Sequence, residues 1–356
     1  MTSATRPPNE RGMALLSAML TVALVTFLAA GAFWQQWRTY EVEAAERQRQ
    51  QSAWLLNGAM DWARLILRED SKSSNHDHLG EPWALPLQEA RLASFLSSQP
   101  GFASSAEDSL ALQVFLSGRI VDLQARLNVA NLLNNEQLSP ADLAAFGKLW
   151  EVLGLPTAQL LSLAEGLRQS RAAPKQALPA APLPPQRLSQ LAWLGLPAPT
   201  LAKLQDHVVW LPERTPVNLN TASAEVLFAT LPGLDLAQAQ RLVRARANQP
   251  WRTLEEVRQV LGAQSGNLQE ERHSVASRFF EITGQIRLDS SLLVEKTTVQ
   301  REGMDVRLLW RERGVPGSLQ CNPHADPCPA PHPKHRDHVR REHRWPKCAV
   351  LWAMPP

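Results

Sequence analysis

The chain has 356 residues, of which 44% are hydrophobic and 20% are charged, and it contains three cysteines. This length supplies one large or two ordinary domains. The charged fraction excludes disorder along the whole chain, and the few cysteines exclude a disulfide-rich scaffold. The formal net charge is +3, which gives no long-range attraction to nucleic acid.

The positive charge is concentrated in residues 315–356. This segment has six Lys and Arg against three Asp and Glu, which leaves residues 1–314 neutral with 31 of each sign. All three cysteines (Cys321, Cys328 and Cys348) and nine of the 27 prolines also lie there. Cysteine and histidine could suggest zinc, but the spacing lacks C-x2-C and apolar residues are scarce. We therefore expect a disordered tail.

Residues 13–33, MALLSAMLTVALVTFLAAGAF, contain no charged side chain. At about 1.5 Å per residue, this segment spans roughly the 30 Å hydrocarbon core of a bilayer. It predicts a transmembrane helix, and Arg6 and Arg11 before it place the short N-terminal tail in the cytoplasm and the rest outside. A cleaved secretory signal peptide, with residues 29–32 as its cleavage site, is the alternative.

The following segment predicts that the same helix continues into water, because residues 34–69 contain no proline. Leu55, Ala59, Trp62 and Ile66 recur at spacings of four, three and four residues. This spacing predicts one apolar stripe that packs on a soluble domain.

A short basic leader that ends in Gly12, followed by such a helix, resembles the precursors of type IV pilin-like proteins and pseudopilins. The resemblance implies that a prepilin peptidase cuts between Gly12 and Met13 and methylates the new N-terminus at Met13. Most pseudopilins carry glutamate at the fifth mature position, where this chain has Ser17. K-type minor pseudopilins of the type II secretion system (the GspK family) characteristically lack this acid. An unpaired carboxylate is costly inside a membrane.

Strand patterns occur on both sides of a helical segment. Leu112, Val114 and Leu116 alternate with other residues, and Ser117-Gly118 predicts a turn after them. Two later sets each predict a half-buried antiparallel strand: Phe280, Ile282, Ile286 and Leu288, then Met304, Val306, Leu308 and Trp310.

Between these strands the pattern is helical. Ser139 predicts a helix N-cap with Pro140 at the first position, and Thr221 or Ser223 predicts another cap. The run Asp122–Leu133 resembles the passage of K-type pseudopilins from their sheet into an inserted helical domain. Residues 172–186 predict an extended, proline- and alanine-rich linker.

Residues 217–246 predict two helices joined by a turn at Pro232 and Gly233. The segment resembles a helix-hairpin-helix unit, which K-type pseudopilins carry. Many such units bind DNA phosphates through hairpin N–H groups, usually with a second glycine. Here that position is Asp235, whose carboxylate repels phosphate. We therefore expect a packing element and no nucleic-acid partner.

Catalytic motifs are absent from the sequence: it has no G-x-S-x-G, phosphate loop or H-E-x-x-H. We therefore expect no enzyme activity. His76-Asp77-His78 could hold a metal weakly, but a solvated polar loop is favoured. The nearby acids are interpreted as loop charge: Glu69, Asp70, Asp77 and Glu81. No cofactor is certain; the resemblance allows calcium, and its ligands cannot be assigned from the sequence.

The resemblance implies an α+β type IV pilin-like fold. A long N-terminal helix packs on an antiparallel sheet, with a large inserted all-α domain that contains the helix-hairpin-helix-like unit. We expect a cleaved leader at 1–12, a transmembrane segment at 13–33, a first pilin-like part at 34–130, the inserted helical domain at 131–277, closing strands at 278–314 and the tail at 315–356.

The implied function is that of a minor pseudopilin that forms the periplasmic pseudopilus tip with I-type and J-type minor pseudopilins. It would support export of folded proteins across the outer membrane. The prepilin peptidase and the inner-membrane assembly platform are further implied partners. The implied location is the inner membrane, single-pass, with the C-terminal body in the periplasm. The alternatives are a DNA-uptake pilin-like protein that uses the hairpin, and an ordinary single-span periplasmic protein.

Overall fold

The computed structural model describes residues 10–92, 94, 114–135, 137–171, 182–262, 268–288 and 291–314, with the side chains of 10–12 and 291 outside the description. Residues 1–9, most of the predicted linker and the predicted tail lie outside the described residues, as does Leu112 of the first predicted strand.

One helix, α1 (Glu10–Ser73), carries both the apolar segment and the first part of the body. Its length follows from the sequence, which has no proline between Pro8 and Pro82. A short 3-10 helix, η1 (Pro82–Ala84), follows the loop after α1.

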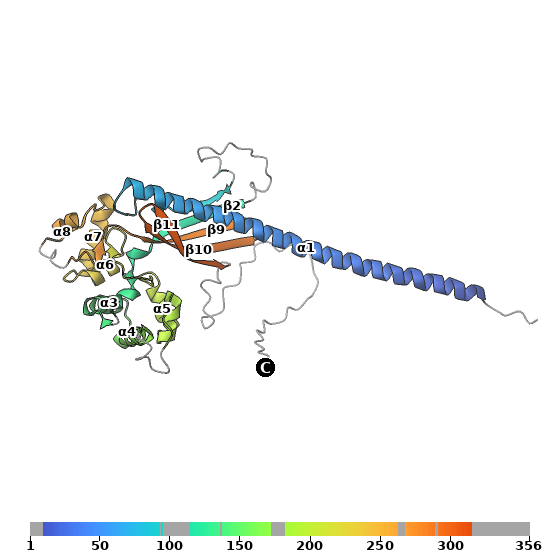
Figure 1. Cartoon of the computed structure of the whole chain (residues 1–356), viewed down its shortest axis with the longest axis horizontal. Helices are drawn as coiled ribbons and strands as arrows, with labels where there is room; N and C mark the ends of the chain where they lie inside the picture. The colour runs from blue at the N-terminus through green and yellow to red at the C-terminus, as the bar shows by residue number, and fades with distance from the viewer. Residues whose placement is uncertain are drawn as a thin grey trace, which may run out of the picture. The chain divides into compact units, whose positions relative to one another are not determined.

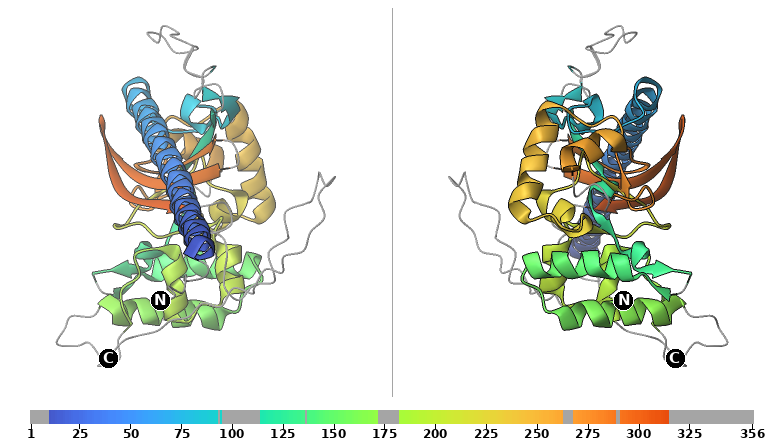
Figure 2. Two further views of the ribbon diagram at one scale, coloured as in Figure 1. Left: turned by 90° about the vertical axis from the view of Figure 1, so that its right-hand side faces the viewer. Right: turned by 90° about the vertical axis from the view of Figure 1, so that its left-hand side faces the viewer.

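Five antiparallel strands form a sheet in the order β1-β2-β9-β10-β11 (Figure 1). They are β1 (Leu87–Arg91), β2 (Val114–Asp122), β9 (Phe279–Leu288), β10 (Ser291–Glu302) and β11 (Asp305–Gly314). The later half of α1 packs on one face of this sheet, and both views of Figure 2 show the helix beside the curved strands. The predicted parity of β9 is confirmed, since the four predicted residues are buried in the core that also contains the α1 side chains: Phe280, Ile282, Ile286 and Leu288.

The phase of the predicted α1 stripe is wrong by one position. The fully buried row is Leu56, Met60, Ala63 and Leu67, and three of the predicted residues lie partly buried beside it: Leu55, Ala59 and Ile66. Gly284 explains the choice of row, because a Cβ at that position would lie 2.4 Å from Met60 Cε. The bare glycine backbone allows Met60 to pack against the sheet.

Two strand predictions are also wrong in detail. Strand β2 runs without a break through Ser117 and Gly118, where a turn was predicted. Gly118 allows β2 and β9 to approach each other closely, since a Cβ there would lie 3.0 Å from the Thr283 carbonyl oxygen. In β11, the register with β10 shifts between Leu308 and Trp310. This β-bulge places Trp310 on the face opposite to Leu308, although the two residues share one parity.

The chain between β2 and β9 is helical with short strand pairs. Its longer helices are α3 (Pro140–Val152), α4 (Thr157–Arg171), α5 (Ala198–Leu204), α6 (Ala224–Thr230), α7 (Leu236–Asn248) and α8 (Leu254–Leu261). Its 3-10 helices are η2 (Leu123–Ala125), η3 (Val129–Leu132) and η4 (Leu188–Leu194). Its two-residue strands pair as β3 (Leu127–Asn128) with β6 (Val208–Val209), β4 (Leu133–Asn134) with β5 (Gln137–Leu138), and β7 (Val217–Asn218) with β8 (His273–Ser274).

This helical region has its own core, which includes Phe146, Trp150, Leu163 and Leu227 and is distinct from the core between α1 and the sheet. Ser139 accepts a hydrogen bond from the Asp142 N–H and Pro140 begins α3, so the predicted cap is confirmed. The long helix, the antiparallel sheet and the helical region together confirm the predicted α+β pilin-like fold.

Candidate functional site

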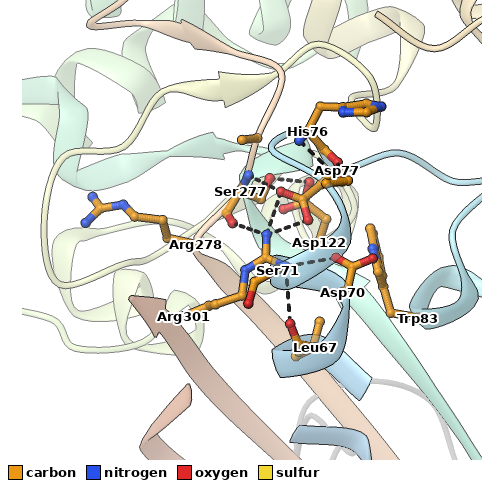
Figure 3. Close-up of polar contacts among 12 residues, drawn as sticks. Leu67, Asp70, Ser71, His76, Asp77, Trp83, Asp122, Ser277, Arg278 and Arg301 are labelled. Carbon is orange, nitrogen blue, oxygen red and sulfur yellow. Dashed lines mark hydrogen bonds and ion pairs between the residues drawn. The ribbon is translucent and has the colours of Figure 1, made fainter. Parts of the chain in front are cut away.

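A buried polar cluster lies where the end of α1, the sheet and the helical region meet, and we call it the Arg301 cluster: Arg301, Asp70, Asp77, Asp122 and Ser277 (Figure 3). The Arg301 guanidinium on β10 donates to Asp70 Oδ2 at 2.9 Å, to Asp77 Oδ2 at 2.7 Å and to the Ser277 carbonyl at 2.9 Å. One arginine therefore connects the end of α1, the loop after it and the segment that returns to β9.

Asp122, the last residue of β2, joins the sheet to the helical region. Its carboxylate accepts hydrogen bonds from the Ser277 hydroxyl at 2.6 Å, the Thr221 hydroxyl at 2.6 Å and the Asn218 amide at 3.0 Å. The Gln124 N–H donates to its other oxygen at 2.7 Å. The carboxylate is fully enclosed and has a donor on every side.

Burial dominates the electrostatics of the cluster. It raises the pKa of Asp122 to about 6, although the surrounding donors act to lower it. Burial also raises the pKa of Asp70 to about 6, with Glu81 and Asp77 adding to the effect and Arg301 opposing it. The pKa of Asp77 is likewise raised, mainly by burial. The cluster holds one guanidinium, which pairs with Asp70 and Asp77, and three carboxylates, so it has excess negative charge when all are ionised.

The interpretation of Asp70, Asp77 and Glu81 as exposed loop charge is wrong, because all three are buried. Their carboxylate oxygens lie within 4.8 Å of one another, a grouping that could suggest a cation site. The geometry does not fit calcium, because Arg301 already supplies the positive charge there. Glu81 is engaged as well: it accepts from Ser74 Oγ at 3.0 Å, the His78 N–H at 2.9 Å and Trp83 Nε1 at 2.7 Å. The grouping is an ion-pair network.

The His76-Asp77-His78 sequence does not converge on a metal position. The two imidazole rings stack with centroids 5.4 Å apart, while Asp77 points inward to Arg301. His78 Nδ1 accepts a hydrogen bond from the Gly80 N–H at 3.1 Å. The structure therefore gives the metal hypothesis no support here.

The predicted hairpin is closed by its own side chains. Gly233 has φ +89°, a left-handed conformation that glycine tolerates. Asp235 caps α7: it accepts the Gln238 N–H at 2.6 Å and donates its own N–H to the Gln238 side chain at 2.8 Å. This capping box occupies two N–H groups at the start of α7 and places a carboxylate there, which disfavours phosphate. Arg246, buried in the same unit, donates to the carbonyls of Leu219 and Ala222.

Two asparagines of the V-N-L-N-T-A-S run have structural roles that the sequence analysis missed. Asn218 reaches into the Arg301 cluster by donating to Asp122 and to Ser277 Oγ at 2.9 Å. Asn220 brackets Trp251, donating to its carbonyl at 2.8 Å and accepting its N–H at 3.0 Å. Buried amides that bond to backbone groups would explain the specific residue types in this run.

The apolar half of α1 is long and apolar enough to cross a membrane, and none of its most apolar window is buried within the described structure. Ser17 donates its hydroxyl to the Ala14 carbonyl at 2.9 Å, so its polar group is satisfied within the helix. The Gly12–Met13 bond lies in the first turn of α1, which begins at Glu10.

Comparisons with known proteins agree with this architecture. The family model "Type II secretion system (T2SS), protein K" matches residues 217–276. Relatives named type II secretion system protein K are 27% identical in Pseudomonas aeruginosa and 25% identical in Klebsiella pneumoniae. The matches cover 87% and 86% of this chain and 94% and 97% of those proteins, respectively.

A chain of the solved GspK-GspI-GspJ complex from enterotoxigenic Escherichia coli aligns with a TM-score of 0.56 at 20% identity. The alignment covers 76% of this chain and 98% of that chain. The long helix, the antiparallel sheet and the inserted helical region define a pilin-like protein with an apolar membrane segment. Over most of its length the chain is similar to proteins named type II secretion system protein K, and the family model of that protein matches part of its helical region. These likenesses support a minor pseudopilin of type II secretion, a structural component of that system.

Proposed function

We propose that this chain is a minor pseudopilin that forms the tip of a periplasmic pseudopilus with I-type and J-type partners and supports export of folded proteins across the outer membrane. The observation that carries the proposal is the coverage of the likeness. It extends over 98% of a chain from a complex that contains K, I and J components, and over 94% of the Pseudomonas aeruginosa relative.

The described contacts support a tip position. The helical region between β2 and β9 is a body with its own core, attached to the pilin-like part through the Arg301 cluster. Such a bulky attachment is hard to repeat along a filament of closely packed helices, but one copy can be accommodated at the end.

The proposal includes maturation at the N-terminus. A prepilin peptidase would cut between Gly12 and Met13 and methylate Met13, leaving the apolar segment at the start of the mature chain. Ser17 would then occupy the fifth position, where its hydroxyl is bonded within the helix and requires no charged partner. The mature protein would be anchored once in the inner membrane with its body in the periplasm.

Processing is tested with Gly12→Leu and with Gly31→Leu as the matched control. Gly31 lies in the same helix, and a Cβ there meets nothing within 4 Å. We expect N-terminal mass spectrometry of membranes to show a mature chain beginning with methylated Met13 for wild type and Gly31→Leu, and the full precursor for Gly12→Leu. A wild-type chain that keeps residues 1–12 in cells with an active prepilin peptidase would overturn the processing step.

Assembly is tested by co-expressing the full chain with the I-type and J-type proteins of the same organism. We expect the three to co-purify as one complex, and we expect secretion to stop when this chain is deleted and to recover when it is restored. A chain that is processed yet neither co-purifies nor restores secretion would overturn the tip assignment.

The hairpin does not favour the DNA-uptake alternative, since the Asp235 carboxylate caps α7 and accepts the Gln238 N–H. We expect no salt-sensitive mobility shift of DNA with the full chain in detergent.

A further inference from the structure

Four aromatic side chains follow directly after the apolar segment of α1, and we call them the aromatic collar: Phe33, Trp34, Trp37 and Tyr40. Their exposed fractions are 73%, 61%, 46% and 70%, respectively. The rings of Trp34 and Trp37 lie with centroids 5.4 Å apart and contact each other. Tyr40 is the single tyrosine of the whole chain.

The collar covers one side of the helix. Phe33, Trp37 and Tyr40 follow at spacings of four and three residues, which places them on one face, and Trp34 lies about 100° beside them. The other side carries the polar residues Gln35, Gln36 and Thr39. This segment of α1 is therefore amphipathic, with aromatic rings in place of aliphatic side chains.

The position of the collar matches the thickness of a bilayer. At 1.5 Å per residue, the rise from Met13 to Trp34 is roughly 31 Å, close to the hydrocarbon thickness of about 30 Å. Within the described part of the chain, the body does not cover the collar. Residues 41–47 of α1 are exposed as well. The Gln48 side chain, one residue further on, donates a hydrogen bond to the Leu288 carbonyl of the sheet.

We propose that the aromatic collar binds the lipid headgroup layer on the side of the membrane opposite to Met13 and sets the depth of α1. Tryptophan and tyrosine favour that layer because an apolar ring and a polar N–H or O–H are satisfied together there. Arg38, within the collar, can extend its guanidinium to the same layer. The proposal rests on the single-pass anchor and adds the residues that fix its depth.

A partner helix is the competing occupant of this face. The lipid layer is favoured because the collar is continuous with the apolar segment and lies one hydrocarbon thickness from Met13. The residue types also combine large rings with polar atoms. A purely aliphatic seam at heptad spacing would instead indicate helix packing.

The test is depth-dependent quenching of tryptophan fluorescence in the full chain. The chain is reconstituted at low density into vesicles of phosphatidylcholine and phosphatidylglycerol that contain a lipid spin-labelled on its headgroup or a lipid brominated near the end of its acyl chains. We expect stronger quenching by the headgroup label. We also expect that quenching to be lost in Trp34→Phe/Trp37→Phe, which removes two of the twelve tryptophans.

Trp54→Phe is the matched control, because Trp54 lies further along α1 with 75% of its surface exposed. We expect this variant to keep the wild-type quenching by the headgroup label. Headgroup quenching that is equal in the double variant and in wild type, or stronger quenching by the brominated chains, would overturn the collar.

The outcomes also separate the collar from the anchor itself. If the chain binds the vesicles but neither label quenches its tryptophan fluorescence, protein or water covers the rings. This result would overturn the role of the collar and leave the anchor standing. A chain that does not float with the vesicles on a density gradient would overturn the single-pass anchor and the collar together.

Discussion

At the scale of single residues, Arg301 supplies the positive charge of the Arg301 cluster. Its guanidinium is nearly buried and contacts two carboxylates that are themselves buried. Buried ion pairs contribute little net stability compared with apolar packing, but removal of one partner leaves an uncompensated charge in a medium of low dielectric constant. The cluster is therefore sensitive to the loss of its single cation.

We predict that Arg301→Met lowers the free energy of unfolding by about 3–5 kcal/mol, because Asp70 and Asp77 lose their counter-ion. Arg307→Met is the matched control on the neighbouring strand β11, where the arginine side chain is 62% exposed. Its loss should leave the urea midpoint close to that of wild type. Urea unfolding followed by circular dichroism measures both; equal effects would contradict the prediction.

The acidic residues of the cluster predict a dependence of stability on pH. Burial raises the pKa of Asp122 from 3.8 to about 6 in the folded chain. The folded state therefore binds a proton at a pH where the unfolded state does not, so this group makes the free energy of unfolding fall as pH rises through that window. Asp70 acts in the same direction.

We predict that Asp122→Asn weakens this dependence between about pH 4 and 6, because the substituted side chain cannot titrate. Urea midpoints at a series of pH values, compared with wild type, measure the difference. Asp305→Asn is the control, since that carboxylate is 63% exposed. Parallel pH profiles for wild type and Asp122→Asn would rule out the titration of Asp122 as a cause.

At the scale of elements, the contact between α1 and the sheet depends on a site without a side chain. Gly284 in β9 faces Met60 and Leu56, which fill the space that a Cβ would take. Overpacking of this kind displaces whole elements because a helix and a sheet are stiff bodies.

We predict that Gly284→Val destabilises the fold by about 1–3 kcal/mol, and that Gly284→Ala costs less because the terminal methyl of Met60 can swing aside. Gly147→Ala, within α3, should be neutral or stabilising by up to about 1 kcal/mol, since nothing lies within 4 Å of its added methyl group. Thermal unfolding measures all three. A Gly284→Val variant as stable as wild type would mean that α1 can move away without loss.

The elements also separate what could be predicted from the sequence from what could not. Ser139 and Pro140 carry a local signal, and the cap they predict is present. The phase of the α1 stripe depends on Gly284, which is distant in sequence. The predicted row and the buried row of α1 are both apolar and look alike in the sequence. The bulge at Leu308 leaves no mark on the parity of β11, because it inserts one residue into an otherwise regular alternation.

At the scale of the whole molecule, the order of motifs predicted the pilin-like fold with its inserted helical region, while the Arg301 cluster was missed. Arg301 and Asp77 are 224 residues apart along the chain. No local pattern marks such a pair, and charged residues in a polar loop are usually solvated. The V-N-L-N-T-A-S run was the available sequence signal for this cluster, because an exposed helix surface would not explain its asparagines.

The strand connections have a consequence for how this molecule arose. The chain leaves the sheet at Asp122, the last residue of β2, and returns to it at the start of β9. Asp122 is the cross-strand partner of Phe280, the second residue of β9. The two ends of the helical region therefore coincide with the two ends of a tight hairpin. A coding segment gained or lost here in one recombination event would leave every strand in register, so the size of the attachment can diverge between lineages while the sheet is inherited unchanged.

This pairing predicts that the attachment can be removed. Replacing residues 123–279 by Asn-Gly should join β2 to β9 through a two-residue turn. We expect the shortened chain to keep a cooperative unfolding transition and the circular dichroism of a helix with a sheet, at reduced stability because Ser277 no longer contacts Arg301. A shortened chain without any cooperative transition would mean that sheet and attachment evolved as one inseparable body.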